Sequence, residues 1–258
     1  YKKLFQTIGN ILDLIEKDDM PKYLLFLENA FPYMDNYNYH KGMNGIIQEL
    51  KGLLKTKNIG TDSDRALLLD FQATLETKPE KAIKLEKDAL AQIENITADN
   101  ARLVSNLHAN LGGLYRMNGH PDLAREHMEK SISLLDQFNL LHINDSIPQI
   151  ANYAMFLTEQ QEPERGISEL QKLSGIIKEY HSDDCLDYAK VQETLGTIYL
   201  MTANLPQAKT HFKRAFKIYE KIWADEPEMI EAKYQEIQEL YPQIGFCIGK
   251  NLSGLLTK

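Results

Sequence analysis

The sequence has few cysteines and no long apolar segment, and each shortage excludes a class of protein. Only Cys185 and Cys247 occur among 258 residues, and they do not form a CxxC motif. A disulfide framework or structural zinc site is therefore not expected, and a reducing compartment such as the cytoplasm is. Because no apolar run is long enough to cross a bilayer and no signal peptide is recognisable, we expect no membrane association.

Positive charge is also scarce. Lys and Arg total 29 against 37 Asp and Glu, which gives a formal net charge of -8 without any basic block. Such a surface repels a phosphate backbone, so nucleic acid is not an expected partner. The hydrophobic share of 43% is enough for the core of one large or two small domains. The chain begins with Tyr1 and reads as helix from there, so we expect it to be part of a longer protein.

Motifs for catalysis and cofactor binding are missing. The sequence contains no G-x-S-x-G, no Ser/His/Asp grouping and no glycine-rich dinucleotide loop, so we expect neither an enzyme nor a cofactor. The segment "GFCIGKN" (245–251) is one residue short of a phosphate loop between its glycines. It also has Asn251 where that loop needs the Ser or Thr that binds Mg²⁺. We interpret it as part of a terminal helix.

Metal ligands occur in two places, and both favour an ordinary structural role. The segment "HSDDC" (181–185) is too short to surround a tetrahedral ion, and its Ser and Asp side chains suit a helix N-cap. His120 and His127 lack the glutamate of an H-E-x-x-H site and are predicted to be surface histidines. We therefore expect no metal. Trp223, within the acidic "EKIWADEPEMIEA", is predicted to pack on the core.

What the sequence does contain is a repeat. Small residues recur at intervals of 42, at Ala82, Ala124, Gly166 and Ala208. Prolines recur with them at Pro79, Pro121 and Pro163, and Pro206 misses the interval by one residue. Proline is favoured in the first turn of a helix, so each proline predicts a helix start. Apolar residues follow four positions after three of the small residues, at Met128, Leu170 and Phe212, and small or apolar residues follow seven positions after all four. Both are steps along one helix face.

A second pattern precedes each proline. Leu111, Gly112 and Tyr115 correspond to Leu195, Gly196 and Tyr199, and the match is weak at Leu69, Asp70 and Ala73. Gly112 and Ala124 are predicted to be small because two helices cross there. Gly119 is predicted to end the first helix in a left-handed conformation.

The combined pattern, L-G-x-x-Y, a turn and A-x-x-x-F-x-x-A, resembles the tetratricopeptide repeat (TPR). Its best match is "ETLGTIYLMTANLPQAKTHFKRAF" (193–216). Such repeats are usually about 34 residues long, whereas these resemble the longer repeats of kinesin-light-chain-type arrays. The resemblance implies an all-α fold, a right-handed superhelix (α-α solenoid) of antiparallel helix pairs. We expect one continuous solenoid made of a degenerate helical lead-in (1–60), four repeats (61–222) and C-terminal capping helices (223–258).

The resemblance also implies a binding surface, the concave groove lined by the first helix of each pair. The matching positions are Asn106, Asn110, Gly113, Arg116, Asn152, Met155, Lys190, Thr194 and Thr197. An asparagine just before the L-G pair offers a donor and an acceptor to an extended peptide. Bonding between neighbouring helices is an equal alternative for Asn110 and Asn152. Arg116 pairs either with a ligand carboxylate or with an acid of this chain.

These patterns favour a non-catalytic module that holds a peptide, a partner protein or another domain of its parent chain in the groove. Arrays similar to this one form the C-terminal sensor of NB-ARC-type signalling ATPases, so we expect a sensor or scaffold part of a signalling protein. The alternative is the peptide-pheromone-binding domain of a transcriptional regulator. An enzyme with a metal site in a loop is a third and less favoured interpretation.

Overall fold

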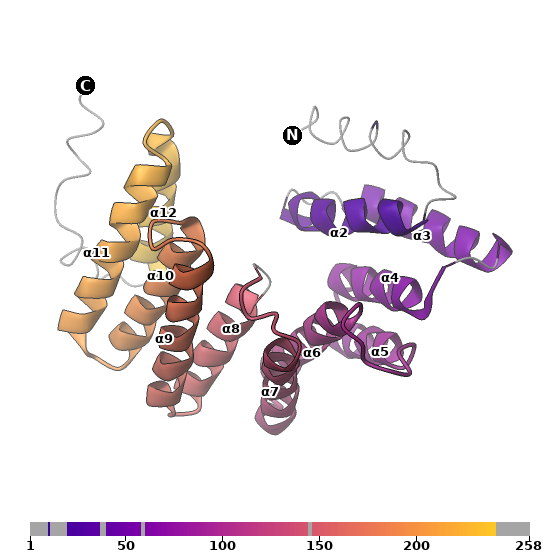
Figure 1. Cartoon of the computed structure of the whole chain (residues 1–258), viewed down its shortest axis with the longest axis horizontal. Coiled ribbons are helices and arrows are strands. Elements are labelled where there is room, and N and C mark those ends of the chain that lie inside the picture. Colours follow the sequence, from indigo (N-terminus) through magenta and orange to yellow (C-terminus); the bar gives the residue numbers. More distant parts are fainter. Residues whose placement is uncertain (1–9, 11–19, 37–39, 58–59, 144–145, 241–258) are drawn as a thin grey trace. The chain divides into compact units, whose positions relative to one another are not determined.

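The computed structural model describes residues 10, 20–36, 40–57, 60–143 and 146–240. Within these ranges the chain consists of helices and their connections, without a strand, as Figure 1 shows. The predicted all-α fold is therefore confirmed. The helices are α2 (Met20–Asn36), α3 (His40–Lys57), α4 (Asp62–Leu75), α5 (Pro79–Leu90), α6 (Ala101–Met117), α7 (Pro121–Gln137), α8 (Ser146–Glu159), α9 (Pro163–Tyr180), α10 (Leu186–Met201), α11 (Leu205–Ile222) and α12 (Pro227–Leu240).

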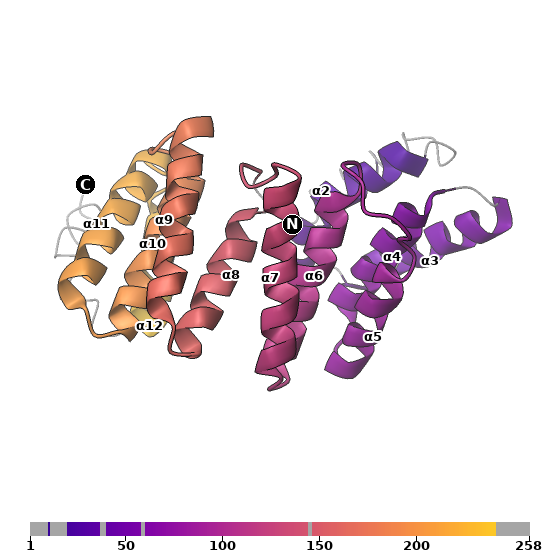
Figure 2. The ribbon, with the colours of Figure 1, turned by 60° about the horizontal axis from the view of Figure 1, so that its bottom comes forward.

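Most of the helices form antiparallel hairpins with short turns. The pairs α4/α5, α6/α7, α8/α9 and α10/α11 are each joined by three residues, at 76–78, 118–120, 160–162 and 202–204. The members of the pairs α8/α9 and α10/α11 lie side by side in Figure 2. The second helices begin at residues 79, 121, 163 and 205, so each starts 42 residues after the last. Proline is the first residue of three of them and the second residue of α11, as predicted.

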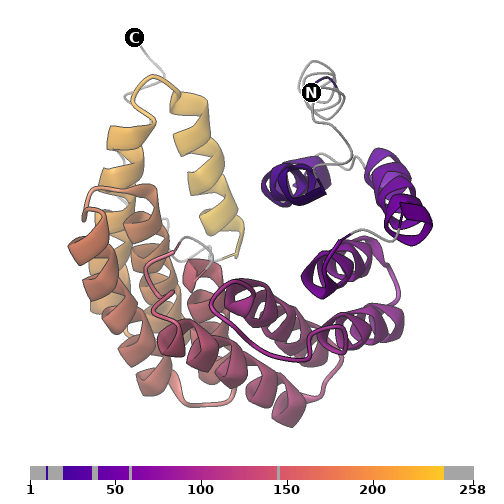
Figure 3. The same ribbon diagram turned by 45° about the vertical axis from the view of Figure 1, so that its right-hand side comes forward.

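The chain forms two compact units, 1–134 and 135–258. In the first unit, α2, α3 and α4 pack against one another, as Figure 3 shows. Their shared apolar cluster includes the stacked rings of Phe31 and Phe71, whose centroids are 4.2 Å apart. In the second unit, α12 packs on α11 and buries Ile230 and Ile237.

Three of the hairpin turns have the same backbone conformation. Gly119 has a φ of 74°, which confirms the predicted left-handed turn. Gln161 and Ala203, placed 42 and 84 residues later, have φ values of 64° and 59°. After each of these residues a backbone N–H donates back to the preceding helix, as from His120 to the Tyr115 carbonyl at 2.9 Å. A left-handed conformation costs non-glycine residues roughly 1–2 kcal/mol, so two of the turns are strained.

The small residues lie where the two helices of a hairpin cross. A Cβ atom on Gly112 would lie 2.6 Å from Met128 Cγ and 3.3 Å from the Ala124 carbonyl oxygen. In α9, a Cβ on Gly166 would lie 2.6 Å from the Ala154 carbonyl oxygen. The predicted crossing of Gly112 with Ala124 is confirmed, because neither helix has room for a larger residue there.

Candidate functional site

The first helices of the hairpins carry all nine predicted site residues, and none of these residues is buried. Asn110, Asn152 and Lys190 are exposed. The others are half-buried, namely Asn106, Gly113, Arg116, Met155, Thr194 and Thr197. The five residues of the second unit lie on α8 and α10, two helices that contact each other. The four residues on α6 belong to the first unit and are described with it.

Asn110 bonds to the neighbouring first helix. Its side-chain amide donates a hydrogen bond of 2.8 Å to Asp70 Oδ1 of α4. This is the contact between helices that the sequence left open as an alternative. The Asn110 side chain also shares a hydrogen bond with Glu86 of α5. Binding of a ligand by Asn110 stays a prediction.

Behind Asn110 lies a pair of carboxyl groups that the sequence patterns did not reveal. Asp70 stands 42 residues before Gly112, and Glu86 stands 42 residues before Met128. The two side chains share a hydrogen bond. Glu86 is only 1% exposed, and its Oε2 atom has no hydrogen-bond partner. The first hairpin therefore places two acids at positions that are small or apolar in the later hairpins.

The surroundings of Asp70 and Glu86 shift the pKa values of both carboxyl groups. Burial raises the pKa of Glu86, and the neighbouring Asp70 charge raises it further. Burial also raises the pKa of Asp70, and Glu28 of α2 adds to this shift, whereas its hydrogen bonds to Glu86 and Asn110 oppose it. Glu86 is therefore a neutral acid that donates its proton to Asp70. The weak repeat match at Asp70 was the one signal in the sequence for this site.

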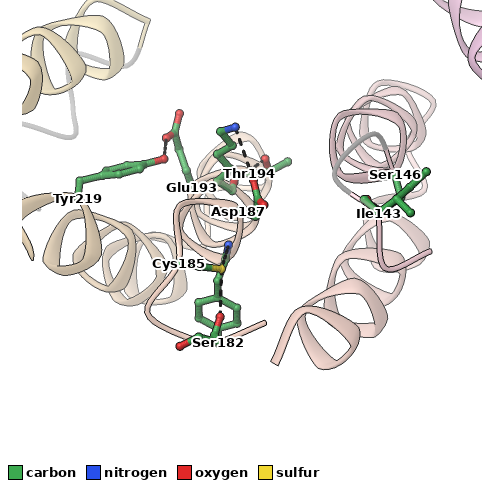
Figure 4. Close-up of polar contacts among 10 residues, drawn as sticks. Ile143, Ser146, Ser182, Cys185, Asp187, Glu193, Thr194 and Tyr219 are labelled. Atoms are coloured by element: carbon green, nitrogen blue, oxygen red, sulfur yellow. Dashed lines mark hydrogen bonds and ion pairs between the residues drawn. The ribbon is translucent and has the colours of Figure 1, made fainter. Parts of the chain in front are cut away.

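Several polar residues of α10 form hydrogen bonds or ion pairs with other residues of the second unit. The Thr194 hydroxyl donates to the Lys190 carbonyl at 3.0 Å, and Lys190 lies 3.7 Å from Asp187. Beside Thr194, Glu193 accepts a hydrogen bond of 2.6 Å from the Tyr219 hydroxyl, which Figure 4 shows directed at the carboxylate. Glu193 also pairs with Lys233 of α12 at 2.9 Å.

The interpretation of His127 as a surface histidine is wrong. Its Nδ1 atom lies 2.9 Å from Nδ1 of His108, and both side chains are half-buried. Burial lowers the pKa of His108 to about 4, and burial also lowers the pKa of His127. The Tyr115 ring stacks on His127 with centroids 5.4 Å apart. His120 is exposed and meets the edge of the Tyr115 ring instead.

The hairpin α10/α11 repeats this arrangement with one histidine. His211 Nδ1 lies 2.9 Å from the Gln192 amide oxygen, and Tyr199 stacks on His211 at 5.2 Å. His211 and Gln192 stand 84 residues after His127 and His108. The sequence repeat therefore extends to a polar contact inside the hairpin.

The "HSDDC" segment caps α10, although through a residue other than the predicted Ser or Asp. Cys185 is the N-cap, and its sulfur accepts from the Tyr188 backbone N–H at 3.4 Å (Figure 4). Asp184 pairs with Lys221. Trp223 stacks on Tyr219 with centroids 4.8 Å apart, in line with its predicted packing role. The "GFCIGKN" segment lies outside the described residues.

Among the residues that the structure describes, no group of three or more His, Cys, Asp or Glu side chains is placed to hold a metal ion. Within the same residues, no helix combines the length and the apolar character needed to span a membrane.

Residues 146–221 match the tetratricopeptide repeat family. This segment covers α8 to α11, the two hairpins of the second unit. Together with the fold, the match supports a TPR protein, as the sequence pattern predicted. A search of curated protein sequences gave no significant match.

Several solved structures are similar in fold. A putative kinesin light chain with nearly identical TPR-like repeats from Podospora anserina is 14% identical, with a TM-score of 0.58 over 76% of this chain and 93% of that chain. Another structure of those repeats gives a TM-score of 0.62 at 13% identity, over 81% of this chain and 99% of that chain. BtubC (BKLC) from P. vanneervenii gives 0.52 at 17% identity, over 79% and 74%. These likenesses support the helical-repeat fold and the kinesin-light-chain-like resemblance.

Proposed function

We propose that this chain binds a peptide or protein partner through the first helices of its hairpins and carries out no catalysis. The observation that supports this proposal is the placement of the nine predicted site residues on α6, α8 and α10. All of them retain exposed surface, whereas neighbours on the same helices, such as Leu111, Tyr153 and Leu195, are buried. TPR folds serve protein interactions in general, which fits a surface of this kind.

Asn152 and Lys190 are the clearest contact residues in the second unit. Both are exposed, and they lie on the adjacent helices α8 and α10. An amide and an ammonium group can both donate to the carbonyl oxygens of an extended peptide backbone. In the first unit, Asn110 and Arg116 would supply the equivalent contacts.

We further propose that the repeat unit is 42 residues long, which the equal spacing of the second helices supports. A role as the sensor or scaffold of a larger signalling protein follows from the resemblance alone. Both ideas fit a module that recognises a partner and has no chemistry of its own. Neither is needed for the binding experiment below.

The binding proposal is tested with peptides selected from a random library on the purified protein. The triple variant Asn110→Ala, Asn152→Ala, Arg116→Ala should lower their affinity at least about tenfold, which is about 1.4 kcal/mol. The matched control replaces Lys209, Lys213 and Glu220, three exposed residues of the second helix α11, by alanine. Equal affinity for the triple variant, the control and the wild type, with unchanged thermal unfolding, would refute the assignment of these residues.

A further inference from the structure

The carboxyl pair of the first hairpin is an unusual feature of an interior helix contact. Asp70 and Glu86 meet between α4 and α5, and Glu86 has a buried oxygen without a partner. An unsatisfied buried polar atom costs about 1–3 kcal/mol, and a buried charge without a counter-ion costs more. A packing role alone does not explain these acids, because Gly112 and Met128 fill the same positions with smaller or apolar groups.

Among the described residues, the groups with the largest effect on Asp70 include no cation. Glu86 of α5 and Glu28 of α2 are both acids. Arg102 of α6 lies 3.6 Å from Glu28, so its charge is already shared with another carboxylate. Asn110 is neutral, and its side chain hydrogen-bonds to both Asp70 and Glu86. A carboxylate in this setting gains more from an added cation than an exposed one does, because water screens it less.

Part of the Asp70 residue is exposed on the surface formed by the first helices. Asp70 is half-buried and Asn110 is exposed, whereas Glu86 lies beneath them in the interior. Both α4 and α6 are first helices, and they contact each other within the first unit. The proposed function places the partner on this surface of the first helices.

We propose that Asp70, Glu86 and Asn110 form an acceptor site for one cationic side chain, a lysine or arginine of the bound partner. Asp70 accepts the cation, and the neutral Glu86 and the amide of Asn110 hold its carboxylate in place. This inference rests on the proposed function and adds the chemistry of the partner. A metal ion fits less well, because no three metal-ligating side chains converge in the described part of the chain.

The side-chain amide of Asn110 gives a direct reporter, since its NMR signal senses the group bound to Asp70. The probes are N-acetyl-lysine amide and n-butylammonium, with N-acetyl-glutamine amide as the neutral control. At about pH 7.5 both cations should shift the Asn110 signal with a saturable curve, and the neutral amide should not. Because the pKa of Asp70 is raised, its charge is lost as the pH falls, so affinity should drop between about pH 7.5 and about pH 5.

Variants separate this site from general attraction to an acidic protein. Asp70→Asn should weaken cation binding at least about tenfold, and Asp70→Ser is a second variant should the first fail to fold. Glu86→Gln should retain binding, since its amide still donates to Asp70, whereas Glu86→Ala should weaken it. Asp62→Asn removes one exposed acid of the same helix and should have no effect.

Three results would overturn the inference: a shift that does not saturate, an equal shift in Asp70→Asn, or saturation by Mg²⁺ or Ca²⁺ but not by ammonium. Its failure is distinct from failure of the proposed function. Selected peptides that still bind Asp70→Asn as well as wild type, yet lose affinity in the Asn152→Ala variant, would remove this site and leave the binding surface in place.

Discussion

At the crossing of α4 and α5 two carboxyl side chains meet, whereas at the crossing of α10 and α11 the backbone of Gly196 approaches the Phe212 ring. The two hairpins have turns of the same length, three residues, and their second helices begin in the same 42-residue spacing. The difference shows that the hairpin geometry does not require an apolar crossing. The later hairpins use this contact for close packing, and the first one uses it to hold ionisable groups.

The largest effect on stability is expected at the crossing of α8 and α9, which leaves no space for a side chain at Gly166. Gly166→Ala should lower the free energy of unfolding by about 3 kcal/mol, because its Cβ would lie 2.6 Å from a backbone oxygen that cannot rotate away. Gly175→Ala is the matched control in the same helix, where a Cβ meets nothing within 4 Å. Chemical denaturation of both variants measures the difference. Equal stability would show that α8 and α9 do not approach as closely as described.

Larger residues on the second helix should disturb the same contact somewhat less. Ala124→Leu and Ala208→Leu should each cost about 2 kcal/mol, because both alanines are fully buried at a crossing. The comparison variant Leu123→Ala changes an exposed neighbour of Ala124 and should be close to neutral. Thermal unfolding midpoints that stay unchanged in both alanine variants would contradict the crossing.

In the first hairpin, a substitution at the crossing should raise the stability of the protein rather than lower it. Glu86→Gln should raise the stability at pH 7 by about 1–2 kcal/mol, because the amide needs no proton to remain neutral in the interior. The gain should shrink as the pH falls, since acid protonates Glu86 in the unfolded chain too. Denaturation at pH 7 and at pH 5 gives both values, with Glu80→Gln, at an exposed site of the same helix, as the control. A loss of stability at pH 7 would mean that Glu86 is charged in the folded protein.

The histidine contact of α6/α7 should make the stability sensitive to acid, and burial lowers the pKa of His211 in α10/α11 as well. The pKa of His108 is lowered to about 4, so the unfolded chain takes up a proton near pH 6.5 before the folded chain does. Stability is complete above pH 6.5 and is lost as the pH falls from 6.5 towards 4. Allowing for partial exposure, we expect a loss of about 1 kcal/mol at pH 5. His108→Gln, which copies Gln192, should make the loss smaller, and a curve that does not change would remove the pair as its cause.

The smallest effect is expected at the strained turns. Ala203→Gly should stabilise the protein by about 0.5 kcal/mol, since glycine adopts the left-handed conformation without the steric cost of a Cβ. Gly119→Ala makes the reverse change at the matching position of α6/α7 and should destabilise. If both substitutions lower the stability, the turn conformation is not what decides it.

The features that the sequence predicted are those set by local chemistry at a fixed spacing. The prolines at helix starts, the left-handed Gly119 and the close approach at Gly112 each follow from the conformational needs of one residue. Periodicity adds the pairing of helices, because the same face must be buried in every hairpin. The helix-pair fold follows from these signals.

The polar contacts could not be predicted in this way. The Asp70–Glu86 and His108–His127 pairs join side chains 16 and 19 residues apart on different helices, and neither pair has a motif. The contact of Asn110 with Asp70 spans 40 residues and depends on how two first helices pack. Cys185 was missed as an N-cap because sulfur is an uncommon acceptor in that role.

The second helices start at a constant spacing, although the helices and the connections between hairpins vary in length. The helices differ in length, from 12 residues in α5 to 18 in α9 and α11. The segment between α5 and α6 spans 91–100, whereas that between α9 and α10 spans only 181–185. Longer helices are thus offset by shorter connections. Each second helix therefore keeps its place in the 42-residue spacing, because the connection that follows it takes up the difference in helix length.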